Sequence, residues 1–353
     1  MIYGLVIRIR NGLFHIRIIP SHRFPMPVIC IGNLSVGGTG KTPHVEYLIR
    51  LLQSRCSIAT LSRGYGRKTR GFLVAHAGSD YYSIGDEPLQ YSHKFDNIIV
   101  AVDEQRVRGI RRLMHDYPLL DVIIMDDGFQ HRRVRPGLSI LLSDYHNLYL
   151  HDYLLPAGNL REPASGAGRA DVIIITKTPK IFSPITRRHI LDEIRPKPGQ
   201  EVLFSYIDYD KPVPLTPAAR QGSQNRYTHI FLLAGIANPY PLKDHLDRLC
   251  DEVITWQFPD HHPYSEKDIM VIRQQFQDHY SRSKIIYTTE KDAMRLRHAN
   301  LLSLLDDVPV AYVPIRVAFH NGDAERFDKL VLNYVERDSR SGSFHTTEDQ
   351  HPA

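Results

Sequence analysis

The amino-acid sequence predicts an α/β protein, in which a mostly parallel sheet covered by helices is followed by a second, smaller α/β domain. Short apolar runs alternate with helical or loop-like stretches along the 353 residues, as in parallel strands joined by crossover helices. A glycine-rich loop joins the first of these runs to a predicted helix. A polar, proline-rich passage over residues 208–225 separates two such series.

The chain begins with a predicted amphipathic helix over residues 1–19. Its apolar residues recur at three- and four-residue intervals, and its arginines fall elsewhere on the helical wheel. This pattern fits a helix packed on the protein's own core and also a helix lying on an anionic membrane surface. No run approaches the roughly 20 apolar residues needed to span a bilayer, so we expect a soluble or peripheral protein.

We expect the first α/β domain over residues 20–205 and a linker over residues 206–226. The smaller domain is expected over residues 227–337 and a disordered tail over residues 338–353, which are rich in Ser, Gly, His, Thr and acids. The strands expected in the first domain are 27–31, 57–61, 97–102, 121–125, 138–142 and 171–176. Those expected in the smaller domain are 227–233, 253–256, 284–288 and 308–313.

Charge is distributed unevenly. Residues 1–70 contain eleven lysines and arginines but only one acid, Glu46, whereas the whole chain carries a formal charge of +5. The asymmetry fits a local anionic partner, such as nucleotide phosphate, an acidic membrane or nucleic acid, and it also fits a solvated basic face. The three cysteines have no paired spacing, which predicts neither disulfides nor a structural zinc site and favours a reducing, cytoplasmic setting.

Residues 32–43, GNLSVGGTGKTP, nearly match the phosphate-binding P-loop motif G-x-x-x-x-G-K-[ST], with Ser35 in place of the first glycine. The loop follows a predicted strand and precedes a predicted helix, so backbone N–H groups and the helix end can face phosphate oxygens. Lys41 is expected to reach the β- and γ-phosphates, and Thr42 to ligate magnesium. The expected nucleotide-binding residues are Ser35, Val36, Gly37, Gly38, Thr39, Gly40, Lys41 and Thr42.

Two adjacent acids, Asp126 and Asp127, end the apolar run that begins at Val122. Acids at the end of a strand are often solvated loop residues. Beside a P-loop, however, this arrangement is how a second magnesium anchor is presented. The metal site expected from the sequence is therefore Thr42 with Asp126 and Asp127.

Eight sequence blocks in a fixed order make the chain resemble the tetraacyldisaccharide 4'-kinase family, the lipid A 4'-kinases of Gram-negative bacteria. The resemblance covers about residues 1–295, and the family shares Ser or Thr at the position of Ser35. The blocks are GNLSVGGTGKTP (32–43), LSRGYG (61–66), GDEP (85–88), DDGFQH (126–131), LPAGNLREP (155–163), AGIANP (234–239), FPDHHP (258–263) and TEKD (289–292).

The resemblance implies a peripheral enzyme at the cytoplasmic face of the inner membrane. It implies transfer of the γ-phosphate of ATP, with Mg²⁺, to the 4'-hydroxyl of a tetraacylated glucosamine disaccharide 1-phosphate in lipid A biosynthesis. It also implies a membrane-associating role for the N-terminal helix, and it indicates no obligate protein partner. The implied catalytic residues are Asp86 and its partner His261, together with Lys41. The residues implied near nucleotide or substrate are Glu87, Arg106, Arg108, His131 and Arg161.

Three other interpretations compete with this one. A P-loop GTPase or metallochaperone-type switch would need an [NT]-K-x-D element, but residues 176–179 read TKTP, with Pro179 where the aspartate should stand. A nucleic-acid-binding module fits the sequence pI of about 9.0, yet no nucleic-acid motif is present. Residues 260–262, DHH, have no further ligands at fitted spacing, which favours a polar loop over a zinc site.

Overall fold

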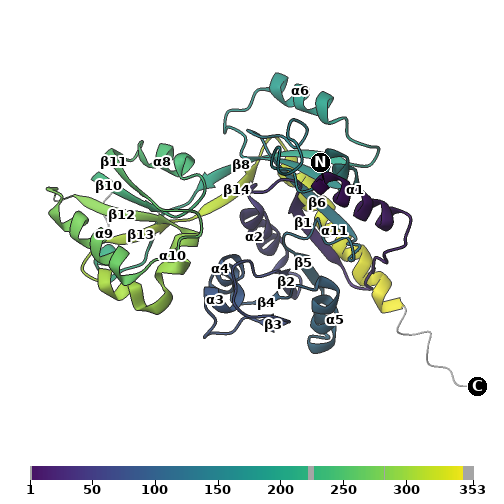
Figure 1. Ribbon diagram of the computed structural model, residues 1–353, viewed down its shortest axis with the longest axis horizontal. Helices are drawn as coiled ribbons and strands as arrows, with labels where there is room; N and C mark the ends of the chain where they lie inside the picture. The colour runs from purple at the N-terminus through teal and green to yellow at the C-terminus, as the bar shows by residue number, and fades with distance from the viewer. Residues whose placement is uncertain (1, 222–225, 282, 345–353) are drawn as a thin grey trace, which may run out of the picture.

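The computed structural model describes residues 2–221, 226–281 and 283–344, and within them the chain forms two sheets (Figure 1). The large sheet has the strand order β14-β8-β7-β6-β1-β5-β2-β4-β3. Its strands are β1 (Val28–Asn33), β2 (Ile58–Ser62), β3 (Leu73–Val74), β4 (Ile98–Val102), β5 (Val122–Met125), β6 (Leu138–Asp144), β7 (Val172–Thr176), β8 (Glu201–Tyr209) and β14 (Ile315–Phe319).

Helices cover both faces of the large sheet, which explains why its central strands read as continuous apolar runs. Strand β1 is buried along its whole length and pairs in parallel with β5 and β6. One face packs against α2, α4 and α11, and the other packs against α5 and α6. The helices are α1 (Ile2–His15), α2 (Lys41–Leu52), α3 (Tyr81–Ile84), α4 (Asp86–Lys94), α5 (Arg106–Asp116), α6 (Pro184–Ile194) and α11 (Asp323–Phe344), with a 3-10 helix at Ala164–Arg169.

The small sheet has the order β11-β10-β12-β13-β9, and all of its pairs are parallel except that of β9 with β13. Its core lies between β10 and α9 on one face and between β10 and α8 on the other. Its strands are β9 (Val213–Pro214), β10 (Tyr227–Ala234), β11 (Cys250–Gln257), β12 (Lys284–Thr289) and β13 (Val310–Val313). Its helices are α7 (Pro217–Gln221), α8 (Tyr240–Leu246), α9 (Glu266–Asp278) and α10 (Glu290–Leu296), with a 3-10 helix at His298–Leu305.

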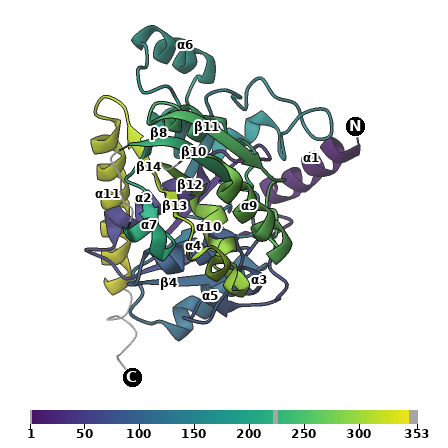
Figure 2. The same ribbon diagram turned by 90° about the vertical axis from the view of Figure 1, so that its left-hand side faces the viewer.

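The chain enters the small domain through β8 and returns through β14, and these two strands pair antiparallel from Tyr209 with Ile315 to Ser205 with Phe319. Figure 2 shows this connection end-on, with α11 running down the side of the large domain. We define the large domain as residues 2–209 and 315–344, and the small domain as the described residues between them.

The predicted fold class and the predicted strands agree with this structure, but two predicted boundaries do not. Strand β14 and helix α11 belong to the large domain, so the small domain does not extend to residue 337. Helix α11 packs its apolar stripe, which includes Phe327 and Val331, on the large sheet. The helix continues to Phe344, so the disordered tail predicted from residue 338 differs from the structure as far as residue 344. Residues 345–353 of that prediction lie outside the described residues. The predicted linker contains the end of β8, with β9 and α7.

Candidate active site

The eight predicted nucleotide-binding residues follow β1, and the last two of them, Lys41 and Thr42, begin α2. Gly37 and Gly40 have φ values of 102° and 87°, which a residue with a side chain rarely adopts. The loop is held from behind by two hydrogen bonds. Thr176 Oγ1 donates to Thr39 O at 2.9 Å, and His44 Nδ1 donates to Gly40 O at 2.7 Å. Burial lowers the pKa of His44 to about 4, so this histidine is neutral at physiological pH.

Asp127 lies between two cations at the end of β5. Arg161 donates to its two carboxylate oxygens at 2.8 and 3.1 Å, and Lys41 Nζ lies 3.8 Å from Oδ1. Burial raises the pKa of Asp127, but the hydrogen bonds from Arg161 and the charge of Lys41 outweigh burial and lower it to about 2. Asp127 also has a left-handed backbone, with a φ of 47°. The site thus holds the P-loop lysine beside a carboxylate that is ionised at neutral pH.

Asp126 has a contrasting environment. Tyr91 donates its hydroxyl hydrogen to Asp126 Oδ2 at 2.9 Å, whereas Oδ1 is buried and has no hydrogen-bond partner. Burial, followed by the charges of Glu87 and Asp127, raises the pKa of Asp126 to about 7. A buried carboxylate oxygen without a partner, close to other acids, fits a cation that neutralises it.

Magnesium usually takes one or two protein carboxylates together with phosphate oxygens and water. The described residues contain no group of three or more His, Cys, Asp or Glu side chains placed to hold a metal. Asp126 and the hydroxyl of Thr42 therefore fit an ion that arrives with nucleotide phosphate. Asp127, which the sequence also suggests as a ligand, is already engaged by Arg161 and Lys41.

The first turn of α4 brings two further acids to the P-loop. Gly85 precedes them with a φ of 94°, and a Cβ atom there would lie 2.8 Å from Tyr65 O, so only glycine allows this turn. Thr42 donates to Glu87 Oε1 at 3.2 Å. The neighbouring Asp86 is buried and faces the small domain.

The small domain contributes His261 to this site. The residue lies in the turn after β11, with a φ of 60°, a conformation that costs an L-residue about 1–2 kcal/mol. Its Nδ1 atom is 2.9 Å from Asp86 Oδ2. Helix α10 adds Arg295, which donates to the same oxygen at 2.7 Å. Burial raises the pKa of Asp86, but the hydrogen bond from His261 and the charge of Arg295 outweigh burial and lower it.

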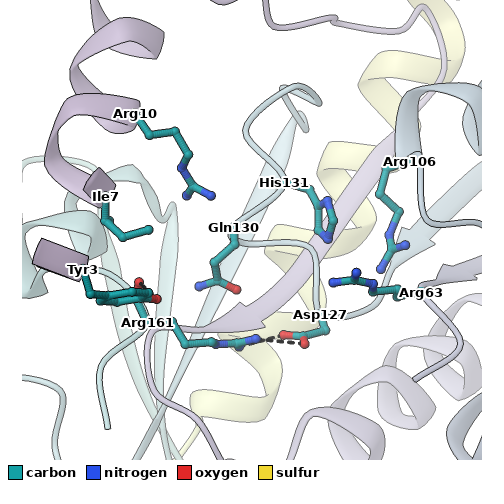
Figure 3. A pocket seen from close by; sticks show the side chains of 9 residues that line it. All are labelled: Tyr3, Ile7, Arg10, Arg63, Arg106, Asp127, Gln130, His131 and Arg161. Atoms are coloured by element: carbon teal, nitrogen blue, oxygen red, sulfur yellow. Dashed lines mark hydrogen bonds and ion pairs between the residues drawn. The ribbon is translucent and has the colours of Figure 1, made fainter. Parts of the chain in front are cut away.

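A cavity of about 210 Å³ lies beside Asp127, on the side that faces α1 (Figure 3). Figure 3 shows that arginines from separate elements point toward it. Arg106 is almost completely buried, and burial lowers the pKa of the neighbouring His131 to about 4, aided by the charge of Arg106. The cavity is lined by Tyr3, Ile7, Arg10, Arg63, Arg106, Asp127, Gln130, His131 and Arg161.

One predicted contact residue lies elsewhere. Arg108 forms a bidentate ion pair with Asp103 at 2.7 and 2.9 Å and does not line the cavity. In contrast, sequence reasoning assigned no role to Tyr3, Arg63 or Gln130. Arg63 and Gln130 stand within the blocks LSRGYG and DDGFQH, so the blocks carried a signal, but no spacing rule links either residue to an N-terminal helix.

Comparisons with known proteins show which family the chain belongs to. The model of the LpxK family, described as tetraacyldisaccharide-1-P 4'-kinase, matches residues 1–336. The chain belongs to this family. It is 42% identical over 361 residues to the tetraacyldisaccharide 4'-kinase of Bacteroides thetaiotaomicron, covering 99% of this chain and 95% of that protein. It is 44% identical to that of Flavobacterium psychrophilum, covering 97% of this chain and 96% of that protein.

Membership of the tetraacyldisaccharide 4'-kinase family makes the chain a phosphotransferase with an alcohol acceptor, and it disfavours the GTPase or metallochaperone-type switch. A solved structure is also similar: LpxK from Aquifex aeolicus in complex with ATP, with a TM-score of 0.70 and 27% identity over 95% of this chain and 96% of that one. Among the described residues, no helix has the length and apolar character to cross a membrane.

Proposed function

We propose that this kinase transfers the γ-phosphate of ATP to the 4'-hydroxyl of a tetraacylated disaccharide 1-phosphate at the meeting point of its two domains. One observation carries the proposal: Thr42 of the P-loop bonds Glu87, and the adjacent Asp86 bonds His261 of the small domain. A phosphate-binding loop and a proton acceptor are thus joined through two consecutive residues.

The P-loop supports nucleotide binding through Lys41 and the backbone N–H groups on either side of Gly40. Lys41 neutralises charge on the phosphates, and Asp127 holds its ammonium group at the end of β5. Thr42 Oγ1 and Asp126 Oδ1 would hold Mg²⁺. When bound, this ion neutralises charge on the β- and γ-phosphates.

The acceptor hydroxyl must lose its proton as its oxygen bonds to the γ-phosphorus and the bond to ADP breaks. We assign the proton to His261 Nε2, and we assign Asp86 to orienting the ring through Nδ1. This reverses the roles implied by the sequence resemblance, in which Asp86 is the catalytic carboxylate. The reason is the ion pair between Asp86 and Arg295, because a carboxylate with a lowered pKa is a weak base.

The arginine-lined cavity supports binding of the phosphate that the disaccharide already carries. Arg63, Arg106 and Arg161 come from three separate loops or helix ends and face one space, as in sites that recognise phosphate. The substitution Arg63→Gln tests this placement. It should raise KM for the lipid acceptor about tenfold and leave KM for ATP unchanged. An equal rise in both KM values would contradict this placement.

Helix α1 supports peripheral binding at the cytoplasmic face of the inner membrane. Its inner side is fixed to the large domain, because Tyr3 donates to Arg161 O at 3.0 Å and Asn11 donates to Glu162 at 3.0 Å. Its outer side exposes Leu5 and Ile9. A lipid acceptor whose acyl chains remain in the membrane would then reach the cavity along the inner side of α1.

The function is tested by incubating the full chain with ATP, Mg²⁺ and a panel of acylated and deacylated disaccharides. Transfer to the acylated disaccharide 1-phosphate is expected, with little transfer to the free sugar. Asp86→Ala and His261→Ala should each lower kcat by about 10²-fold and leave ATP binding intact. The double variant should lose less than the product of the two losses, since the residues act as a unit. Multiplicative losses would contradict the pair.

A further inference from the structure

Arg295 is the largest fully buried side chain among the described residues, and it contacts both members of the proposed pair. Its side chain is 1% exposed. Its Nε and Nη2 atoms donate to Asp86 Oδ2 at 3.0 and 2.7 Å. Its Nη1 atom donates to Gly235 O and to Asp292 Oδ1, both at 2.9 Å. The guanidinium group is therefore fixed between two carboxylates and shielded from solvent.

Both side-chain oxygens of Asp292, the second of these carboxylates, accept hydrogen bonds. Its Oδ2 accepts hydrogen bonds from Gly235 N at 3.0 Å and from Thr289 Oγ1 at 2.7 Å. Its Oδ1 accepts one from Tyr264 at 3.2 Å, besides that from Arg295. These contacts give the TEKD block, residues 289–292, a physical role, because the block starts helix α10 and fixes the position of Arg295.

The ring nitrogen Nδ1 of His261 has two polar neighbours, one of which requires it to donate a hydrogen bond and the other to accept one. Asp86 Oδ2 lies 2.9 Å away and can only accept a hydrogen bond when ionised, whereas Arg295 Nη2 lies 3.2 Å away and can only donate. The charge-assisted bond to the carboxylate is the shorter and the stronger of the two. Nδ1 therefore carries the hydrogen, and the lone pair of the neutral ring is on Nε2.

The positive charge of Arg295 is what makes this arrangement stable. Without it, the buried carboxylate of Asp86 would take its neutralising charge from a proton. A protonated Asp86 would donate a hydrogen bond to Nδ1, and the ring hydrogen would then have to be on Nε2. The lone pair would be lost from Nε2.

We propose that Arg295 is a positioning residue that fixes the tautomer of the His261 ring, with its hydrogen on Nδ1 and its lone pair on Nε2. The inference rests on the proposed role of His261 as the proton acceptor. Two other groups face this ring: Asp260 Oδ1, 3.9 Å from Nε2, and the ring of Tyr65, at a centroid distance of 5.5 Å. Neither touches Nδ1, so Asp86 and Arg295 decide which nitrogen carries the hydrogen.

The test is nitrogen-15 NMR of the histidine rings in the full chain at neutral pH, with the His261 signals assigned by their loss in His261→Ala. The wild type should show a protonated Nδ1 and an unprotonated Nε2. In Arg295→Met the unprotonated Nε2 signal should disappear. Arg295→Lys should keep part of the unprotonated Nε2 signal, because lysine retains the positive charge but lacks the two-pronged guanidinium geometry. The matched control is Arg273→Met, which removes a surface arginine paired with Asp307 in the same domain.

Kinetics add a second measurement. Arg295→Met should lower kcat by about 10²-fold with little change in KM for ATP, and on a His261→Ala background it should cost less than about twofold. If folded Arg295→Met keeps the wild-type His261 signals, the positioning role is wrong whatever the activity. If Arg295→Met does not fold, the test rests on Arg295→Lys. Unchanged His261 signals and unchanged activity in that variant would overturn the positioning role of the guanidinium group. If His261→Ala keeps full turnover, the proposed base is wrong, and the NMR result still reports on Arg295.

Discussion

Lys291 Nζ lies 2.9 Å from Glu87 Oε1, and the same oxygen accepts a hydrogen bond from Thr42 of the P-loop at 3.2 Å. One carboxylate thus joins the small domain to the phosphate loop. Helix α10 also carries Arg295, four residues after Lys291, and Arg295 pairs with Asp86. Two cations on one helix turn therefore face two consecutive acids on α4, and together they hold the domains in contact at the site.

Lys291→Met should destabilise the protein by about 1–2 kcal/mol. Breaking a fully buried ion pair costs about 3–5 kcal/mol, but the side chains of Lys291 and Glu87 are 30% and 25% exposed, so solvent screens part of this cost. The measurement is urea unfolding at neutral pH. The control Lys243→Met breaks a more exposed pair with Asp247 and should cost less than about 0.5 kcal/mol. Equal losses in the two variants would show that the interdomain pair adds nothing.

Lys41→Ala should lower the rate of phosphate transfer by several powers of ten, because catalysis of this kind depends mainly on positioning and charge neutralisation. Thr42→Ala should have a comparable effect, and Asp126→Asn should raise the Mg²⁺ concentration needed for half-maximal rate. The measurement is transfer of radiolabelled phosphate under saturating lipid. Ile181→Ala, at an exposed position outside the site, serves as the control. Near-normal rates in Lys41→Ala would remove the P-loop from the mechanism.

Replacing Leu5 and Ile9 together by aspartate should weaken sedimentation with anionic vesicles by about 30-fold, because each exposed apolar side chain adds on the order of 1 kcal/mol at a membrane surface. These substitutions are preferable to truncation, since removing α1 would also remove Tyr3 and Arg10 from the cavity. Leu119→Asp, at an exposed position outside α1, should leave vesicle binding unchanged. Unaltered binding of the double variant would exclude α1 as the membrane contact.

Stability should fall as the pH drops from about 6.5 to 4, partly because of His44. Burial lowers the pKa of His44 to about 4 in the folded chain, against 6.5 for the free side chain, so the unfolded chain binds the proton first. The contribution of this group is fully present above pH 6.5 and is lost progressively below it, by about 3 kcal/mol at pH 4. Comparing the unfolding of wild type and His44→Gln across this range measures it. Parallel curves would contradict the assignment.

Local patterns predicted the six central strands of the large sheet, because these are continuous apolar runs, but they predicted neither β3 nor β8. The fixed spacing of the P-loop was also recognisable. The same patterns could not place β14 and α11, since nothing local to residues 315–344 says which sheet they join. The site residues were likewise predicted only in part by local patterns. Lys41, Thr42 and the acids after β5 followed from motif and strand, whereas Asp86 and His261 came from family resemblance alone.

The contacts of Arg295 were hidden for a further reason. Asp86 and Arg295 are 209 positions apart in the chain, and they meet only because two domains fold against each other. A buried arginine also cannot be told from a surface arginine by sequence. The periodicity of a helix indicates which face of the helix a residue occupies, but it does not indicate which carboxylate the residue contacts. Charge pairs across a domain boundary therefore have no signature within a short stretch of sequence.

The adjacency of β8 and β14 makes the small domain an insertion, with its entrance and exit side by side. A short turn from Tyr209 to Ile315 would close the large sheet without any of the intervening residues, since these two already pair. Such a shortened protein would keep the P-loop and Asp86 but would lack His261, the proposed proton acceptor. The phosphate-binding loop and the proposed proton acceptor thus belong to separate segments of the chain, and they are brought together only in the assembled fold.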